Sequence, residues 1–286
     1  MIFGALALLA ACNKAPPQPP ARVALWEISD TSGVRGWLFG TVHALPPGLQ
    51  WRRPAIDKAL ADADRLVLEI GEPLDAQVGS AALGRLAFTP GLPPPSARIA
   101  MKFRPDLAKA YKALSLSDDR FRDQESWAVA LQIAAIGGQK EGMEADSGVE
   151  PQLRKLMAGR TIAGLETIDS QLGIFDHLPP REQQVLLEQV AVEVADEKNE
   201  DADMMQLWLR GDDLGIARES AKGFLADPGL HHALLTERNA SWARQIDAML
   251  KAGARPFVAV GAAHVAGGDG LPRMLEARGW HVRRVD

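Results

Sequence analysis

The chain contains a single cysteine, Cys12, among its 286 residues. One cysteine cannot form a disulfide within the chain and cannot supply a cysteine-based zinc site. The chain also has no block of like charge, and its formal net charge is −5, so we do not expect a nucleic-acid partner. Hydrophobic residues make up 47% and charged residues 24%, which excludes a wholly disordered protein.

A long hydrophobic run is missing as well. Residues 1–11 (MIFGALALLAA) are apolar and uncharged, but they are too few to span a bilayer as a helix. They fit the apolar part of a secretory signal, although no Lys or Arg precedes them. Leu9-Ala10-Ala11-Cys12 resembles the bacterial lipobox, in which the cysteine receives lipid and becomes the new N-terminus. We therefore predict a signal peptide over 1–11 and lipid attachment at Cys12; the alternative is a frayed apolar N-terminus.

The segment after the cysteine reads as a tether. Residues 13–21 contain four prolines and no large apolar side chain, which favours extended polyproline geometry. Asn13 in place of Asp after the cysteine favours the outer membrane. The sequence thus predicts a lipid-anchored tether over 12–21 and a folded domain over 22–286. The expected location is the bacterial cell envelope, on the periplasmic side of the outer membrane.

The folded part has the pattern of an α/β protein. Strands are predicted over 23–28, 37–42, 65–70, 161–165, 256–260 and 280–285, the first two as a hairpin. Helices are predicted over 54–63, 75–86, 104–114, 126–136, 151–157, 180–195, 202–210, 230–250 and 271–278. Because βα units lie at both chain ends, we expect a mixed, largely parallel central sheet with a helical insert over about 75–230.

Ionisable side chains follow four of these strands. His43 and His264 each close a Gly-x-x-His sequence after an apolar strand, beginning at Gly40 and Gly261. Glu69 ends a third strand and Glu166 follows a fourth. Since ligands of parallel sheets sit at the carboxyl ends of the strands, these groups are expected at one edge. Taken one at a time, each is more simply a capping or salt-bridged residue.

This set of groups suits several chemistries. Two imidazoles and one or two carboxylates fit a divalent metal that keeps open positions for water. Metal-bound water becomes a nucleophile near neutral pH, and a remaining carboxylate can act as general base. The same groups can also work without a metal, with His43 as the base and Glu69 orienting it. A third possibility is a non-catalytic protein that binds or inhibits a peptide.

Longer motifs resemble one family. LWEI, WLFGTVHALP and ADRLVLEI are similar to the opening of TraB/GumN proteins, which include the Tiki proteins of animals. The later motifs follow in order: Asp146-x-Gly148-Val149-Glu150, Gly164-Leu165-Glu166-Thr167 with Gln171, Arg238-Asn239 with Trp242, and the closing FVAVGAAHVAGGDGLPRMLEARGWHVRRV. The resemblance covers roughly residues 23–286.

The resemblance implies a fold of the erythromycin-esterase and ChaN-like group. In the Tiki branch, two Gly-x-x-His motifs and a glutamate underlie a metal-dependent peptidase activity that favours manganese or cobalt. Here these positions are His43, His264 and Glu69; zinc is also compatible with them. The Arg-Asn pair maps to Arg238 and Asn239, where an arginine can stabilise an oxyanion or bind a substrate carboxylate. Glu166 is expected to act as a base or as a structural acceptor, and the substrate is a peptide or small molecule.

Overall fold

The computed structural model describes residues 21–73, 76–196 and 200–285. The predicted signal peptide and nearly all of the predicted tether, including Cys12, lie outside these residues. None of the helices in the described ranges has the length and apolar character needed to cross a bilayer. The division into leader, tether and domain stays a prediction.

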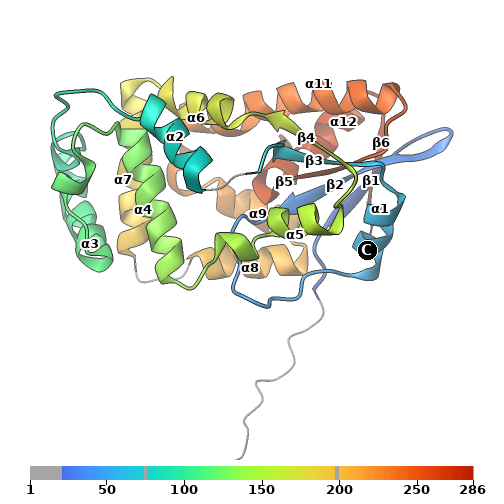
Figure 1. Ribbon diagram of the computed structural model, residues 1–286, viewed down its shortest axis with the longest axis horizontal. Helices are drawn as coiled ribbons and strands as arrows, with labels where there is room; N and C mark the ends of the chain where they lie inside the picture. The colour runs from blue at the N-terminus through green and yellow to red at the C-terminus, as the bar shows by residue number, and fades with distance from the viewer. Residues whose placement is uncertain (1–20, 74–75, 197–199, 286) are drawn as a thin grey trace, which may run out of the picture.

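A six-stranded sheet forms the centre of the α/β part (Figure 1). Its order is β4-β3-β5-β2-β1-β6, in which β2, β5, β3 and β4 are parallel and β1 and β6 are antiparallel to their neighbours. The strands are β1 (Leu25–Asp30), β2 (Gly33–Thr41), β3 (Arg65–Ile70), β4 (Thr161–Glu166), β5 (Pro256–Gly261) and β6 (His281–Val285). This confirms the predicted hairpin and the mixed, largely parallel sheet.

The central strands are apolar on both faces because helices cover both (Figure 1). Phe39, Leu68 and Phe257 point into a core with α1 (Pro54–Asp62), α5 (Val149–Leu156), α8 (Glu200–Arg210) and α9 (Asp213–Ser220). Their neighbours Leu38, Val67 and Val258 face α11 (Glu237–Lys251) and α12 (Leu271–Glu276) on the other side. The alternation of residues between two cores is the period of two expected of strands.

The helical insert, at the left of Figure 1, has a hydrophobic core of its own. It consists of α2 (Ala76–Leu86), α3 (Arg104–Leu114), α4 (Ser126–Lys140), α6 (Ile168–Asp176), α7 (Pro180–Ala195) and α10 (Pro228–His231). A wide π-turn, His232–Thr236, joins α10 to α11, so the single helix predicted over 230–250 is interrupted near its start.

Two helices were not predicted from the sequence. α6 begins at a capping box formed by Thr167 and Ser170, and α9 begins where the Asp212 side chain accepts from the Gly215 amide. Both start signals are short polar sequences, and neither is followed by a long apolar repeat.

Candidate functional site

The four predicted groups do meet at one edge of the sheet. His43 lies two residues beyond β2, Glu69 is the second-last residue of β3, Glu166 ends β4, and His264 lies in a short 3₁₀ turn directly after β5. Because these four strands are parallel, their carboxyl ends lie together. The strand ends therefore bring these groups together, although His43 and His264 are 221 residues apart in sequence.

Arg238, on α11, connects the buried groups. Its Nε and Nη2 atoms donate to the two oxygens of Glu166 at 3.1 and 2.9 Å, and Nη2 also donates to Glu69 Oε2 at 2.8 Å. Its Nη1 donates to the Leu234 carbonyl at 3.3 Å and to His264 Nε2 at 3.2 Å. All five guanidinium N–H groups are thus used. The Arg238 side chain is only 10% exposed, so its ion pairs are not surface ion pairs.

His264 is sealed in the interior with its orientation fixed. Asn239 donates its amide to the Asp269 carbonyl at 2.9 Å, which turns its Oδ1 atom toward His264 Nδ1 at 2.7 Å. Nδ1 must then carry the proton, and Nε2 carries a lone pair. The ring also packs on Trp242, with 4.4 Å between the ring centroids. Asn239 therefore determines which nitrogen of His264 faces the site.

Glu69 is buried among donors. It accepts from the Gly261 amide at 2.7 Å and from Gln171 at 2.9 Å, besides Arg238. Burial alone would raise the pKa of Glu69, but the positive charges of His43 and Arg238 and the hydrogen bond from the Gly261 amide outweigh burial and hold the pKa well below its usual range.

The positive charge of Arg238 favours the ionised form of Glu69 and the neutral form of His264. Burial lowers the pKa of His264; Glu69 opposes this shift, and the nearby Arg238 adds to it. Because the guanidinium favours an anion and disfavours a second cation, we assign an ionised Glu69 beside a neutral His264.

His43 lies at the open side of the site. Its side chain is 70% exposed, and Nδ1 lies 2.8 Å from Glu150 Oε1. The same carboxylate oxygen accepts from the Thr41 hydroxyl at 2.5 Å. The charge of Glu150 raises the pKa of His43 above its ordinary value. The carboxylate that orients His43 is therefore Glu150, and not Glu69 as the metal-free interpretation expected.

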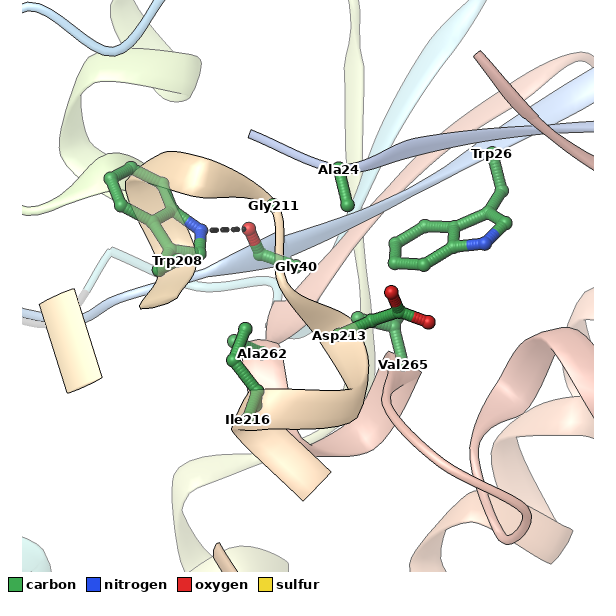
Figure 2. Close-up of a pocket in the computed structure, with 9 residues that line it drawn as sticks. All are labelled: Ala24, Trp26, Gly40, Trp208, Gly211, Asp213, Ile216, Ala262 and Val265. Atoms are coloured by element: carbon green, nitrogen blue, oxygen red, sulfur yellow. Dashed lines mark hydrogen bonds between the residues drawn. The ribbon is translucent and has the colours of Figure 1, made fainter. Parts of the chain in front are cut away.

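The motif glycines allow close approach. A methyl group on Gly40 would lie 2.8 Å from Val265 Cγ2, so only glycine lets β2 contact the turn that carries His264. The Gly40 carbonyl accepts from Trp208 at 2.8 Å (Figure 2). A methyl group on Gly261 would lie 3.2 Å from Glu69 Oε1 and 3.6 Å from His43 Nε2, so this glycine leaves space at the centre of the site.

The hollow in Figure 2 lies beside the site and does not include its ionisable groups. It is a small apolar space lined by Ala24, Trp26, Gly40, Trp208, Gly211, Asp213, Ile216, Ala262 and Val265. Gly40 and Ala262, from the two Gly-x-x-His segments, are among its lining residues. Its lining is almost entirely apolar, so it does not suit a polar substrate.

The predicted metal ligands are close together, but they do not form a closed cluster. His264 Nε2 and Glu69 Oε1 are 3.9 Å apart. In the part of the chain that the structure describes, no group of three His, Cys, Asp or Glu side chains is arranged to hold a metal ion as it stands.

Comparison with known proteins identifies the family of this chain. The model of the TraB/PrgY/gumN family matches residues 24–284. The chain belongs to the TraB/PrgY/gumN family. Among curated relatives, this family member is 24% identical over 244 residues to "Uncharacterized protein YbaP" of Escherichia coli (strain K12), covering 83% of this chain and 86% of that one. The protein of the same name in Shigella flexneri matches equally. No solved structure gives a significant match.

The TraB/PrgY/gumN motifs contain three site residues whose roles the sequence did not reveal. Glu150 binds His43, Gln171 binds Glu69, and Trp242 donates to Glu166 at 2.9 Å while its ring lies 4.6 Å from the Arg238 guanidinium. Each stands in a motif next to a predicted residue, but nothing in the spacing says which groups meet.

Proposed function

We propose that this TraB/PrgY/gumN protein is a metal-dependent hydrolase that acts on peptides. One observation carries the proposal. Both motif histidines have Nδ1 against a protein oxygen; His264 Nε2 lies 3.9 Å from Glu69 Oε1, and His43 Nε2 and Glu69 Oε1 both lie within 4 Å of the place that a methyl group on Gly261 would take. Metal-binding histidines are typically held this way, with one ring nitrogen on an outer acceptor and the other on the ion. The choice of peptides rests on the resemblance to the Tiki branch.

The donor set fits a divalent ion. His43, His264 and Glu69 would hold it, and manganese, cobalt or zinc is compatible with these nitrogen and oxygen ligands. Two ligands that each lie about 2.1 Å from one ion can be up to about 4.2 Å apart, so the 3.9 Å between His264 Nε2 and Glu69 Oε1 allows a shared ion. Arg238 Nη1 would have to give up its contact with His264 Nε2.

The charge of the site also favours a cation. Two carboxylates, Glu69 and Glu166, contact the guanidinium of Arg238, a third, Glu150, contacts His43, and His264 is neutral. A bound divalent ion would supply water activation, because it lowers the pKa of a water ligand toward neutrality.

Other residues of the protein would orient the groups that carry out this chemistry. Arg238 keeps Glu69 ionised and fixes its direction, and Glu166 and Trp242 in turn hold Arg238. Asn239 keeps the Nε2 lone pair of His264 toward the site. His43 is exposed, so a substrate reaches the site from its side. Arg238, Asn239 and Glu166 thus act here as positioning residues.

The test is the metal content of the purified full chain, measured beside peptide cleavage with and without Mn²⁺. We expect about one ion per chain in the wild type and a large loss in His43→Ala and His264→Ala, because each removes a ligand. His281→Ala, on the exposed edge strand β6, is the matched control and should keep its ion.

Other results would decide against the proposal. Equal metal content in the wild type and His43→Ala, with cleavage by neither, would exclude it. Activity that survives a chelator but disappears in His43→Ala would select the metal-free hydrolase. Tight peptide binding that leaves the peptide intact after long incubation would select a binding or inhibitory protein.

We also propose that Cys12 carries a lipid anchor in the bacterial cell envelope. The support is the lipobox-like sequence Leu9–Cys12 and the proline-rich segment after it. Cys12→Ser should move the protein from the membrane fraction to the soluble fraction, because no lipid chain would then hold it. Ser115→Ala, far from this segment in the sequence, serves as control. If Cys12→Ser stays with the membranes, the anchor is wrong.

A further inference from the structure

Glu150 reaches His43 from a different part of the chain. It lies in the first turn of α5, 107 residues after His43, and its Oε1 atom is shared between His43 Nδ1 and the Thr41 hydroxyl. Thr41 is the last residue of β2 and is almost completely buried. A buried hydroxyl whose oxygen lies 2.5 Å from a carboxylate oxygen holds that oxygen in one place.

The helix that carries Glu150 is itself fixed to the strand ends. The Val149 amide donates to the Val42 carbonyl at 3.1 Å, which ties the start of α5 to the end of β2. Further along α5, Arg154 donates to the carbonyls of Ile70 and Gly71 at 2.8 Å, at the end of β3. The position of α5, which carries Glu150, is therefore set by contacts that do not involve the His43 side chain.

These contacts determine the hydrogen-bonding direction. Thr41 supplies its hydroxyl proton to Glu150, so the proton between Glu150 and His43 belongs to His43 Nδ1. The lone pair of neutral His43 is then on Nε2, an atom that, like Glu69 Oε1, lies within 4 Å of the place that a methyl group on Gly261 would take. A free histidine has no such constraint, and the ring of His43, being largely exposed, has few other contacts to fix it.

We propose that Glu150, held by Thr41, is the positioning residue of His43 and presents its Nε2 atom to the site. The proposal rests on the proposed function only where it treats His43 Nε2 as a metal ligand. It also distinguishes the two motif histidines. His264 is oriented by the neutral amide of Asn239, whereas His43 is oriented by a carboxylate, which makes its ring the more basic of the two.

The first experiment does not depend on metal or activity. In protein labelled with ¹⁵N-histidine, long-range ¹H–¹⁵N spectra report which ring nitrogen of His43 carries the proton, with His43→Ala giving the assignment. At pH about 10, where a free histidine is neutral, we expect the wild type to keep the proton on Nδ1. In Glu150→Ala the proton should move mainly to Nε2, as in free histidine.

Variants of Thr41 and Glu150 separate positioning from folding. Thr41→Ser keeps the hydroxyl and should behave as the wild type, whereas Thr41→Val removes it and should give a mixture of the two tautomers. If Glu150→Ala does not fold, Glu150→Gln is the substitute and should also give a mixture. Asp146→Ala, which removes an exposed acidic residue four positions away, should change nothing. A wild type with the proton on Nε2, or a folded Glu150→Ala that keeps it on Nδ1, would overturn the proposal.

The second experiment measures the Kd for Mn²⁺. If Nε2 binds metal, Glu150→Ala should raise this Kd by about 10–100-fold, the range for loss of an outer hydrogen bond to a metal-binding histidine. Thr41→Val should also raise the Kd for Mn²⁺, whereas Thr41→Ser, which keeps the hydroxyl, should have the wild-type Kd. A wild type that binds no Mn²⁺ would speak against the proposed metal function, while the tautomer measurement would still decide the role of Glu150.

Discussion

Replacing Arg238 by methionine is expected to lower the free energy of unfolding by ~3–5 kcal/mol, the range for removing one partner of a buried ion pair. The guanidinium balances Glu69 and Glu166, which are both about 90% buried. Without it, two carboxylates would remain in the interior close to each other. They would have to take up protons or draw in water, and both changes cost free energy.

Urea or thermal unfolding of Arg238→Met, checked by circular dichroism, measures this effect. Arg244→Met, an exposed position on the same helix, is the matched control and should change stability by no more than about 0.5 kcal/mol. Adding Glu166→Gln to Arg238→Met should recover part of the loss, because one unpaired charge is then removed. Arg238→Lys should recover little, since a point charge cannot replace five N–H donors.

The opposite result would be informative. If Arg238→Met were as stable as Arg244→Met, the buried charges would not be coupled as the hydrogen bonds indicate. If the stability fell but the second substitution recovered nothing, the loss would come from packing against Trp242 and not from charge.

Replacing Gly148 by alanine is expected to displace His43 and destabilise the protein by ~1–3 kcal/mol, the cost of overpacking. A methyl group there would lie 2.1 Å from the carbonyl oxygen of His43 and 2.9 Å from that of Ala145. Both obstacles are backbone atoms, so no side-chain rotation relieves them. The start of α5 must move away from the end of β2, which breaks the Val149–Val42 hydrogen bond and separates Glu150 from His43.

Stability and the His43 tautomer, measured on the same variant, test this. Gly84→Ala is the control: Gly84 lies in α2, a methyl group there meets nothing within 4 Å, and the change should be neutral or stabilising. Gly148→Ala should also lose the Nδ1 proton of His43. A variant with normal stability and a normal tautomer would mean that α5 does not set the position of Glu150.

Much of the fold follows from short stretches of sequence. The six predicted strands correspond to β1–β6 within a few residues. The central strands β2, β3 and β5 are the clearest, because strands buried on both faces are continuous apolar runs. The order of the strands does not follow in the same way. β2 and β3 are parallel with α1 between them in sequence, yet β5 from the C-terminal end of the chain lies between them in the sheet. No local signal encodes that insertion.

The sequence by itself determined the family, the α/β class and the strand-end placement of His43, Glu69, Glu166 and His264, since parallel strands bring their carboxyl ends to one edge. Only the tertiary structure decided which groups touch. Arg238 joins Glu69 and Glu166 across 169 and 72 residues of sequence, and Glu150 meets His43 across 107. The physical reason is the distance along the chain over which each kind of interaction acts. Strand and helix patterns arise from neighbours along the chain, whereas a hydrogen bond depends on side-chain directions that are set only when separate elements have packed.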